Sequence, residues 1–211
     1  MFQLIKGASI KDISGLREEY HVVDNMLCAN VSAENIIKVF DAFLNRIEDD
    51  EPLFLFIEAP CNQEDESKLN SQKPDDENAA FVFHKDVYYL DGCNREDIRA
   101  LLHSGAGEVL INDGLVCFGF GSFNSNTELG KYKYNVLKGF VHGQDTEFLT
   151  DIFDKLSIPR VSEIVTAWSL FSEDNYGESR RYEFEGKDIY TLIEQMEELG
   201  LYKAETREED A

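Results

Sequence analysis

An apolar run at residues 53–59, LFLFIEA, constrains the fold more than any other segment of this chain. It lies between Pro52 and Pro60, and seven residues are too few for an independent helix. Its aromatic and branched side chains are typical of strands, and apolar residues at successive positions indicate burial on both faces. The run therefore predicts a buried strand.

Apolar residues spaced three and four apart, the pattern of an amphipathic helix, occur on both sides of this strand. Residues 31–47 show this pattern, with Ser32 expected as the N-cap. Residues 145–156 show it again, with Asp145 expected as the cap, and residues 188–199 form a third such segment. Three helices are therefore predicted.

Capping residues support two helix ends. Asn94 is expected to cap a short helix, because Asp97 lies at the third position after it and its carboxylate can interact with free amides of the first turn. Gly200 follows the third predicted helix, in a position where glycine commonly ends helices.

The centre of the chain carries strand signals. Residues 81–92 and 131–141 are predicted strands, and a possible short strand lies at 180–184. Two apolar runs within 109–120 are separated by Asn112, Asp113 and Gly114, which predicts a β-hairpin with a tight turn. We therefore expect an α+β fold, with a mainly antiparallel mixed sheet and flanking helices. A doubly wound parallel sheet is disfavoured, because regular strand–helix alternation is missing.

The length of 211 residues and a hydrophobic content of 43% fit one globular domain over residues 1–204, with two packed lobes as the alternative. Residues 61–79 are expected to form a mobile acidic loop, because Leu69 is the single apolar side chain in 62–78. Residues 205–211 are expected to form an acidic tail.

The formal charge of −22 comes from 42 acidic and 20 basic residues. Such a protein repels nucleic-acid phosphates and anionic lipid headgroups, so we expect neither nucleic acid nor membrane as a partner. Cations or basic proteins are the expected partners, and the alternative reading is that the charge serves solubility alone. The N-terminal residues do not resemble a signal peptide, so a cytoplasmic location is expected.

Cysteine and histidine offer few chemical signals. Cys28, Cys61, Cys93 and Cys117 include no C-x-x-C pair, which favours free thiols in a reducing compartment. An exposed Cys61 or Cys93 with His84 or His103 as its base is the catalytic alternative to inert thiols. The histidines, which also include His21 and His142, lack metal-ligand spacing. We expect no metal and no cofactor.

Two further motifs are weak. Residues 103–107, HSGAG, place Ser104 beside His103, but the glycine spacing of a nucleophile elbow is missing. Residues 119–124, GFGSFN, lack the lysine and hydroxyl ending of a phosphate-binding loop, so a turn at the end of a strand is favoured. No catalytic residue is assigned.

The leading hypothesis is a non-enzymatic binding protein that neutralises a basic protein partner, as an antitoxin or immunity-type inhibitor does. Trp168 is expected in the core, or, if partly exposed, it forms an aromatic anchor together with Tyr176. The expected partner-binding residues are Glu64, Asp65, Glu66, Asp75, Asp76, Glu77, Trp168 and Tyr176.

Two rival functions remain open. A small hydrolase or transferase would have its site near the 109–120 hairpin, with nearby loops at Asp91 and Trp168. A regulatory or structural acidic domain differs from the leading hypothesis only in its partner.

Overall fold

The computed structural model describes residues 1–71, 82–141 and 146–208. The strands in these residues are β1 (Ala8–Ile10), β2 (Glu19–Val23), β3 (Met26–Asn30), β4 (Leu53–Pro60), β5 (His84–Cys93), β6 (Cys117–Ser122), β7 (Thr127–Lys131), β8 (Val136–Val141), β9 (Gly177–Ser179) and β10 (Tyr202–Glu208). The α-helices are α1 (Ala33–Leu44), α2 (Gln63–Ser71), α3 (Arg95–Leu102), α4 (Gly105–Asn112), α5 (Glu147–Lys155), α6 (Ala167–Leu170) and α7 (Ile189–Glu197), and a short 3-10 helix η1 spans Lys133–Asn135.

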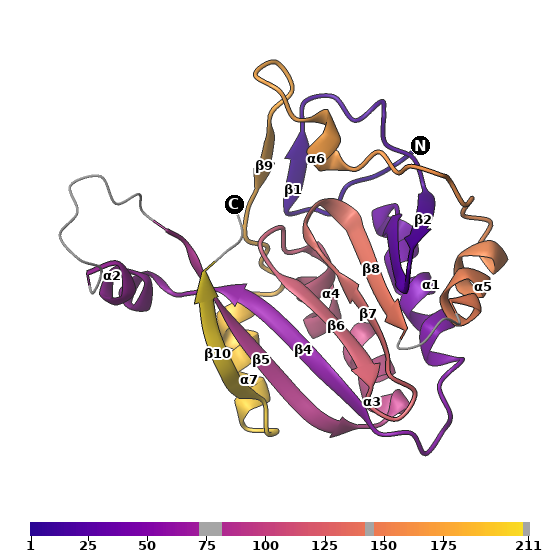
Figure 1. Cartoon of the computed structure of the whole chain (residues 1–211). Coiled ribbons are helices and arrows are strands. Elements are labelled where there is room, and N and C mark those ends of the chain that lie inside the picture. Colours follow the sequence, from indigo (N-terminus) through magenta and orange to yellow (C-terminus); the bar gives the residue numbers. More distant parts are fainter. Residues whose placement is uncertain (72–81, 142–145, 209–211) are drawn as a thin grey trace.

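Eight strands form one antiparallel sheet in the order β10-β5-β4-β6-β7-β8-β3-β2. Helices α1, α3, α4 and α7 all lie against the same face of this sheet (Figure 1). Strands β1 and β9 form a separate two-stranded sheet. The predicted α+β fold with a mainly antiparallel sheet is confirmed, with the main helices on one side.

Strand β4 is the buried strand that the 53–59 run predicts, paired with β5 on one side and β6 on the other. Its side chains alternate between the two faces of the sheet. Leu53, Leu55 and Ile57 belong to the core under the helices, whereas Phe54 and Phe56 are buried outside that core. The face that carries Phe54 and Phe56 is called the open face below.

Helix α1 confirms the first helix prediction, and its buried side chains meet the sheet. The Phe40 ring lies 5.3 Å from the Phe118 ring and 5.1 Å from the Phe120 ring, which fixes α1 over β6. The expected cap is wrong, because the Ser32 hydroxyl accepts a hydrogen bond from the Gln3 amide and makes no cap bond to α1. The N-terminal segment therefore takes the hydroxyl that the helix was expected to use.

The other local signals hold. Asn94 and Asp97 form a reciprocal capping box at the start of α3. Asp188 caps α7, and Gly200 beyond it has a φ of +104°, which glycine tolerates better than other residues. Helix α5 confirms the helix predicted at 145–156, although Asp145 lies outside the described residues.

The predicted hairpin at 109–120 is wrong. The first apolar run continues α4, whose start is capped by Ser104, and the helix extends to Asn112. The Asp113 carboxylate then accepts hydrogen bonds from the amides of Leu115, Val116 and Tyr182, so the chain leaves the helix toward β6. Strand β6 therefore pairs with β4 and β7 and not with the run at 109–111. Residues 112–114, the expected turn, instead form hydrogen bonds with the backbones of Gly7 and Arg180.

The strand predicted over 131–141 is interrupted. Tyr134 and Asn135 have φ values of +54° and +64°, and they separate β7 from β8. The buried Asn135 amide explains the interruption, because it donates to the carbonyls of Gln3 and Val31 and accepts from the amide of Ile5. The strand considered at 180–184 is absent from the described residues, apart from a single bridge at Phe184.

Two segments expected to be irregular have regular structure. Residues 63–71 form α2 within the expected loop 61–79, and residues 205–208 of the expected tail belong to β10, which pairs with β5. Residues 72–81 and 209–211 lie outside the described residues. Backbone pairing with β5 at the edge of the sheet, rather than burial of apolar side chains, accounts for β10, since all seven of its residues are exposed.

Candidate partner-binding surface

Trp168 lies on the one-turn helix α6 with 55% of its surface exposed, so the expected core position is wrong. Its ring packs edge-on against the rings of Tyr134, at 5.3 Å, and Phe171, at 5.4 Å. Tyr134 and Phe171 also contact each other, at 5.1 Å. Three mutually packed rings therefore hold an exposed indole in a defined orientation.

Tyr176 is also exposed, at 59%, and its backbone is held by the preceding residue. The Asn175 side chain accepts from the Asp12 amide at 2.7 Å and donates to the carbonyl oxygens of Asp12 and Leu170. Gly177, on the other side of Tyr176, packs so closely that a side chain there would overlap the Phe171 ring. Helix α6, which carries Trp168, lies beside β1 and β9, and Tyr176 directly precedes β9 (Figure 1).

Acidic side chains lie close to this aromatic pair in the sequence. Glu163, Glu173, Asp174 and Glu178 are all exposed and all lie within the segment that carries the two rings. We call the set of Trp168, Tyr176 and these four carboxylates the aromatic–acidic surface. Nearby, hydrogen bonds from Ser14 hold the pKa of the Asp12 carboxyl below its ordinary value, so this acid is ionised at neutral pH.

The open face next to Trp168 is cationic. A pocket of about 290 Å³ is lined by Trp168 and Tyr132 together with Lys85, Lys133 and Lys138. The Lys138 ammonium lies over the Tyr132 ring at 4.7 Å, and the Lys85 ammonium pairs with Glu58 at 2.8 Å. The exposed indole therefore stands between an acidic segment and a group of lysines.

The acidic residues expected on the loop do not act together. Glu64 is exposed and pairs with Lys68, and Asp65 is partly exposed. Glu66 turns inward, with 12% of its side chain exposed, and its Oε1 lies 2.8 Å from Nδ1 of His84. Glu66 is therefore unavailable to a partner.

Asp75, Asp76 and Glu77 lie outside the described residues.

Helix α2 has no buried residue, so its attachment to β5 and to the residues just before it comes from polar contacts and not from apolar packing. The Glu66 carboxylate accepts a hydrogen bond from the His84 amide at 3.0 Å in addition to its ring contact. The Asn70 side chain exchanges two hydrogen bonds with the backbone of Val82. These contacts take the place of the apolar face that α2 lacks.

We expect Glu66→Ala to release α2, because it removes both contacts with His84 and leaves that imidazole buried with fewer partners. The local opening free energy should fall by about 1–2 kcal/mol. Hydrogen exchange of the amides in 63–71 measures this change. Glu64→Ala, on the exposed side of the same helix, is the control, and equal exchange in both variants would contradict the clamp.

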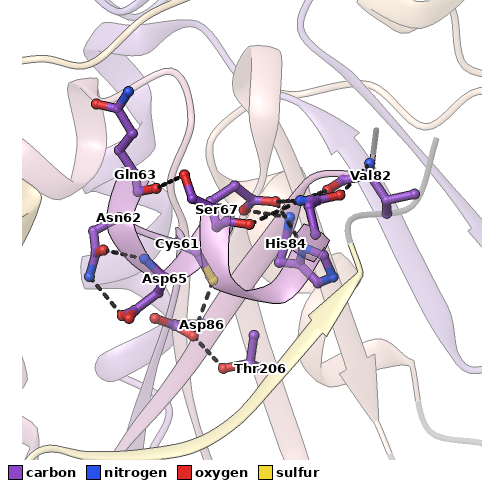
Figure 2. Close-up of polar contacts among 11 residues, drawn as sticks. Cys61, Asn62, Gln63, Asp65, Ser67, Val82, His84, Asp86 and Thr206 are labelled. Carbon is purple, nitrogen blue, oxygen red and sulfur yellow. Dashed lines mark hydrogen bonds and ion pairs between the residues drawn. The ribbon is translucent and has the colours of Figure 1, made fainter. Parts of the chain in front are cut away.

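The thiols are unsuited to nucleophilic catalysis at neutral pH. Burial and a 3.3 Å hydrogen bond from Cys61 Sγ to Asp86 raise the pKa of the Cys61 thiol to about 12 (Figure 2). Burial raises the pKa of the Cys93 thiol to about 11. The two histidine rings considered as bases face carboxylates, since His84 contacts Glu66 and His103 contacts Asp41.

The other chemical candidates have structural roles. Ser104 donates to the Leu101 carbonyl and accepts from the Ala106 amide, which joins α3 to α4. Gly119 and Gly121 lie within β6 rather than in a turn. Gly105 and Gly107 lie in the first turn of α4. Each motif is thus accounted for by backbone geometry.

In residues 1–71, 82–141 and 146–208, no three His, Cys, Asp or Glu side chains are arranged to share a metal ion. Across the same residues, no helix has both the length and the apolar character that crossing a membrane requires. No protein-family model, curated protein or solved structure matches this chain. The local geometry is therefore the basis for any functional proposal.

Sequence reasoning missed the residues that support the anchor. Tyr134 looked like a strand residue, and nothing in the local pattern around Asn175 or Phe171 marks either as a support for Trp168 or Tyr176. The available signal was the polar, turn-forming stretch after Trp168, which made an exposed aromatic pair one of the alternatives.

Proposed function

We propose that this chain is a non-enzymatic binding protein that neutralises a basic protein partner, as an antitoxin or immunity-type inhibitor does. The observation that carries the proposal is Trp168, which is exposed yet packed against Tyr134 and Phe171 beside the exposed Tyr176. Tryptophan and tyrosine dominate binding hot spots. A ring already held in place loses little conformational entropy on binding, so more of its contact energy appears as affinity.

Charge supports the partner class. A net charge of −22 attracts a basic protein over a distance and raises its encounter rate. Four exposed carboxylates, all within ten residues of Trp168 or Tyr176 in the sequence, carry part of that charge in the segment of the proposed anchors. Lys138, whose ammonium lies over the Tyr132 ring in the neighbouring pocket, would meet an acidic group of the partner, which adds specificity to a surface of mixed sign.

The rival enzyme hypothesis placed its site at a hairpin that does not form. The raised thiol pKa values further weaken a cysteine-based version of it. The other rival, an acidic regulatory domain, makes the same use of the aromatic–acidic surface and differs in the identity of its partner. Identification of the captured protein separates these two.

Affinity capture at low salt, from the cells that produce the chain, should recover a basic protein. With that protein purified, Trp168→Ala should weaken binding by about tenfold or more, because an anchor is lost from the centre of the contact. Leu199→Ala is the matched control, since Leu199 is exposed in the turn after α7 and lies near Leu90 and Asp91 of β5 rather than in this surface. Recovery of no basic protein, or equal losses in the two variants, would contradict the proposal.

Association kinetics test the electrostatic part. Raising salt from low to physiological concentration should slow association several-fold and change dissociation much less, because exposed charges are screened beyond about 8 Å. Glu173→Lys together with Asp174→Lys should slow association at low salt. Glu66 is left unchanged in such a test, because its substitution would disturb α2 instead of the surface.

A further inference from the structure

One cross-strand row on the open face combines aromatic rings with a single carboxylate. The strand register places Phe54 of β4 opposite Gly121 of β6, Gly121 opposite Glu128 of β7, and Glu128 opposite Phe140 of β8. Residues directly opposite each other in a sheet project from the same face. Glu128 therefore lies on the same face as the two phenylalanines that flank it in the row.

Glycine in this row makes room for the aromatic rings. A side chain at Gly121 would come within 2.9 Å of Cζ of Phe54, so only hydrogen leaves space for that ring. Phe123, on the turn between β6 and β7, stacks on Phe54 with a centroid distance of 4.6 Å and an angle of 30°. Phe123 remains 69% exposed, so one face of this stack is open to a ligand.

Glu128 has no protein counter-charge. Within the described residues, no hydrogen bond or ion pair reaches its carboxylate, although the side chain is partly buried. Partial burial and the nearby charge of Glu58 raise its pKa. A carboxylate that is withdrawn from water without a partner is costly, and a bound cation would remove that cost.

These residues enclose a pocket of about 250 Å³. Its lining contains the rings of Phe54, Phe123 and Phe140, the carboxylate of Glu128, and the amides of Asn25 and Asn126. Aromatic faces attract cations, and carboxylate and amide oxygens accept hydrogen bonds. The negative charge of Glu128 disfavours an anion, so the lining is complementary to a cationic group.

We propose that this pocket, called the Glu128 pocket, binds a guanidinium group, and that an arginine side chain of the protein partner supplies it. A guanidinium group is planar, so it can stack flat on an aromatic ring and can form two parallel hydrogen bonds with one carboxylate. An ammonium group is not planar and offers neither of these two geometries. The guanidinium site stands on its own geometry. The identity of the arginine's source rests on the proposed function.

The pocket lies within reach of the aromatic–acidic surface. Val136 and Lys138 of β8 line the lysine pocket beside Trp168, and Phe140 of the same strand lines the Glu128 pocket. Phe140 lies four positions after Val136, a distance of about 13 Å along an extended strand. A partner of ordinary interface size can therefore cover Trp168 and insert an arginine into the Glu128 pocket together.

Titration of the whole chain with N-acetyl-arginine amide, followed by amide chemical shifts in NMR, tests the site without a partner. We expect saturable shifts centred on residues 121–128, with a dissociation constant on the order of millimolar. N-acetyl-citrulline amide, which has a similar shape and no charge, should bind at least tenfold more weakly. Equal binding of the two amides, or shifts located elsewhere, would overturn the assignment.

Two variants identify the groups involved. Glu128→Gln should reduce arginine-amide affinity at least tenfold, and Phe123→Ala should reduce it several-fold without unfolding the chain, because Phe123 is largely exposed. Glu194→Gln removes an acid of the same charge on α7, which lies against the other face of the sheet, and should leave the affinity unchanged. Retained affinity in Glu128→Gln would overturn the proposal.

Failure of this inference is distinguishable from failure of the proposed function. If the captured basic protein binds Glu128→Gln as tightly as the natural chain, while Trp168→Ala weakens it, the partner's arginine does not occupy the pocket and the function stands. If the arginine amide binds at Glu128 but no basic protein is captured, the guanidinium site stands, and both the function and the source assigned to the arginine are wrong.

Discussion

We expect the unfolding free energy of the natural chain to gain about 3 kcal/mol from Lys131 between pH 7 and pH 10.5, and we expect Lys131→Met to abolish this contribution. Lys131 is fully buried in β7, and its ammonium donates to the carbonyl oxygens of Asp113 at 2.6 Å and Val116 at 3.0 Å. The contacts are to backbone carbonyls rather than to a carboxylate. Burial lowers the pKa of Lys131 to about 8.

The increase of unfolding free energy with pH follows from the different proton binding of Lys131 in the folded and unfolded chains. Between pH 8 and pH 10.5 the unfolded chain keeps the Lys131 proton, because the ordinary pKa is 10.5, whereas the folded chain loses it. Stability therefore rises with pH across this window, and the penalty for the buried charge is fully present below pH 8. Methionine has a similar length and no proton to lose, so its variant lacks this contribution.

Urea unfolding of both proteins at several pH values measures the difference between their free energies. Taking the difference matters, because other groups act in the opposite direction. Burial raises the pKa values of Tyr20 and Cys61 to about 12, so their contributions to stability are lost at alkaline pH. These contributions are shared by both proteins and cancel. Parallel pH profiles for the two proteins would show that Lys131 does not titrate in this window.

Gly114→Ala is expected to lower the unfolding free energy by about 3 kcal/mol. An added methyl group would overlap the carbonyl of Gly7, which is backbone and cannot rotate away as a side chain can. Gly7 lies in a three-way junction. Its amide donates to the Asn112 carbonyl, its carbonyl accepts from the Arg180 amide, and the Arg180 carbonyl accepts from the Gly114 amide.

The physical cause differs from the one that a tight turn would imply. Gly114 is absent from the residues with positive φ, so the expected cost comes from close approach of two backbones and not from a left-handed conformation. Gly105→Ala is the control, because its added methyl would lie 3.4 Å from the Phe184 ring, within the first turn of α4. That variant should change stability by less than about 0.5 kcal/mol, since alanine favours helix.

Urea or thermal unfolding of the two glycine variants distinguishes these outcomes. A melting temperature of Gly114→Ala as high as that of Gly105→Ala would show that the junction can open without cost. A large loss in both variants would instead indicate general intolerance of alanine at these glycines, with no special role for the junction.

Local sequence determined the elements whose signals lie within a few residues. The spacing of Ile36, Phe40 and Phe43 specifies α1, and the two prolines around 53–59 delimit β4. Asn94 and Asp97 lie three positions apart, and the side chain of each accepts a hydrogen bond from the backbone amide of the other, which caps the start of α3. These signals are reliable because periodicity and capping depend on neighbours along the chain.

Tertiary contacts decided the outcome wherever a polar group found a distant partner. Asp113 would suit a hairpin turn, but its carboxylate binds the Tyr182 amide 69 positions away. Glu66 would suit an acidic surface, but it binds His84. Such partners are invisible to local patterns, because a buried polar group is satisfied by whichever donor or acceptor the fold brings to it.

The candidate surface was predictable only in part. Sequence alone determined a strongly acidic chain and named Trp168 and Tyr176 as a potential anchor pair. The tertiary structure decided that both are exposed, that Tyr134 and Phe171 support the indole, and that Glu128 lies among three phenylalanine rings. Exposure and pocket lining depend on strand register and on packing between segments that are distant in the sequence, and no local pattern encodes either.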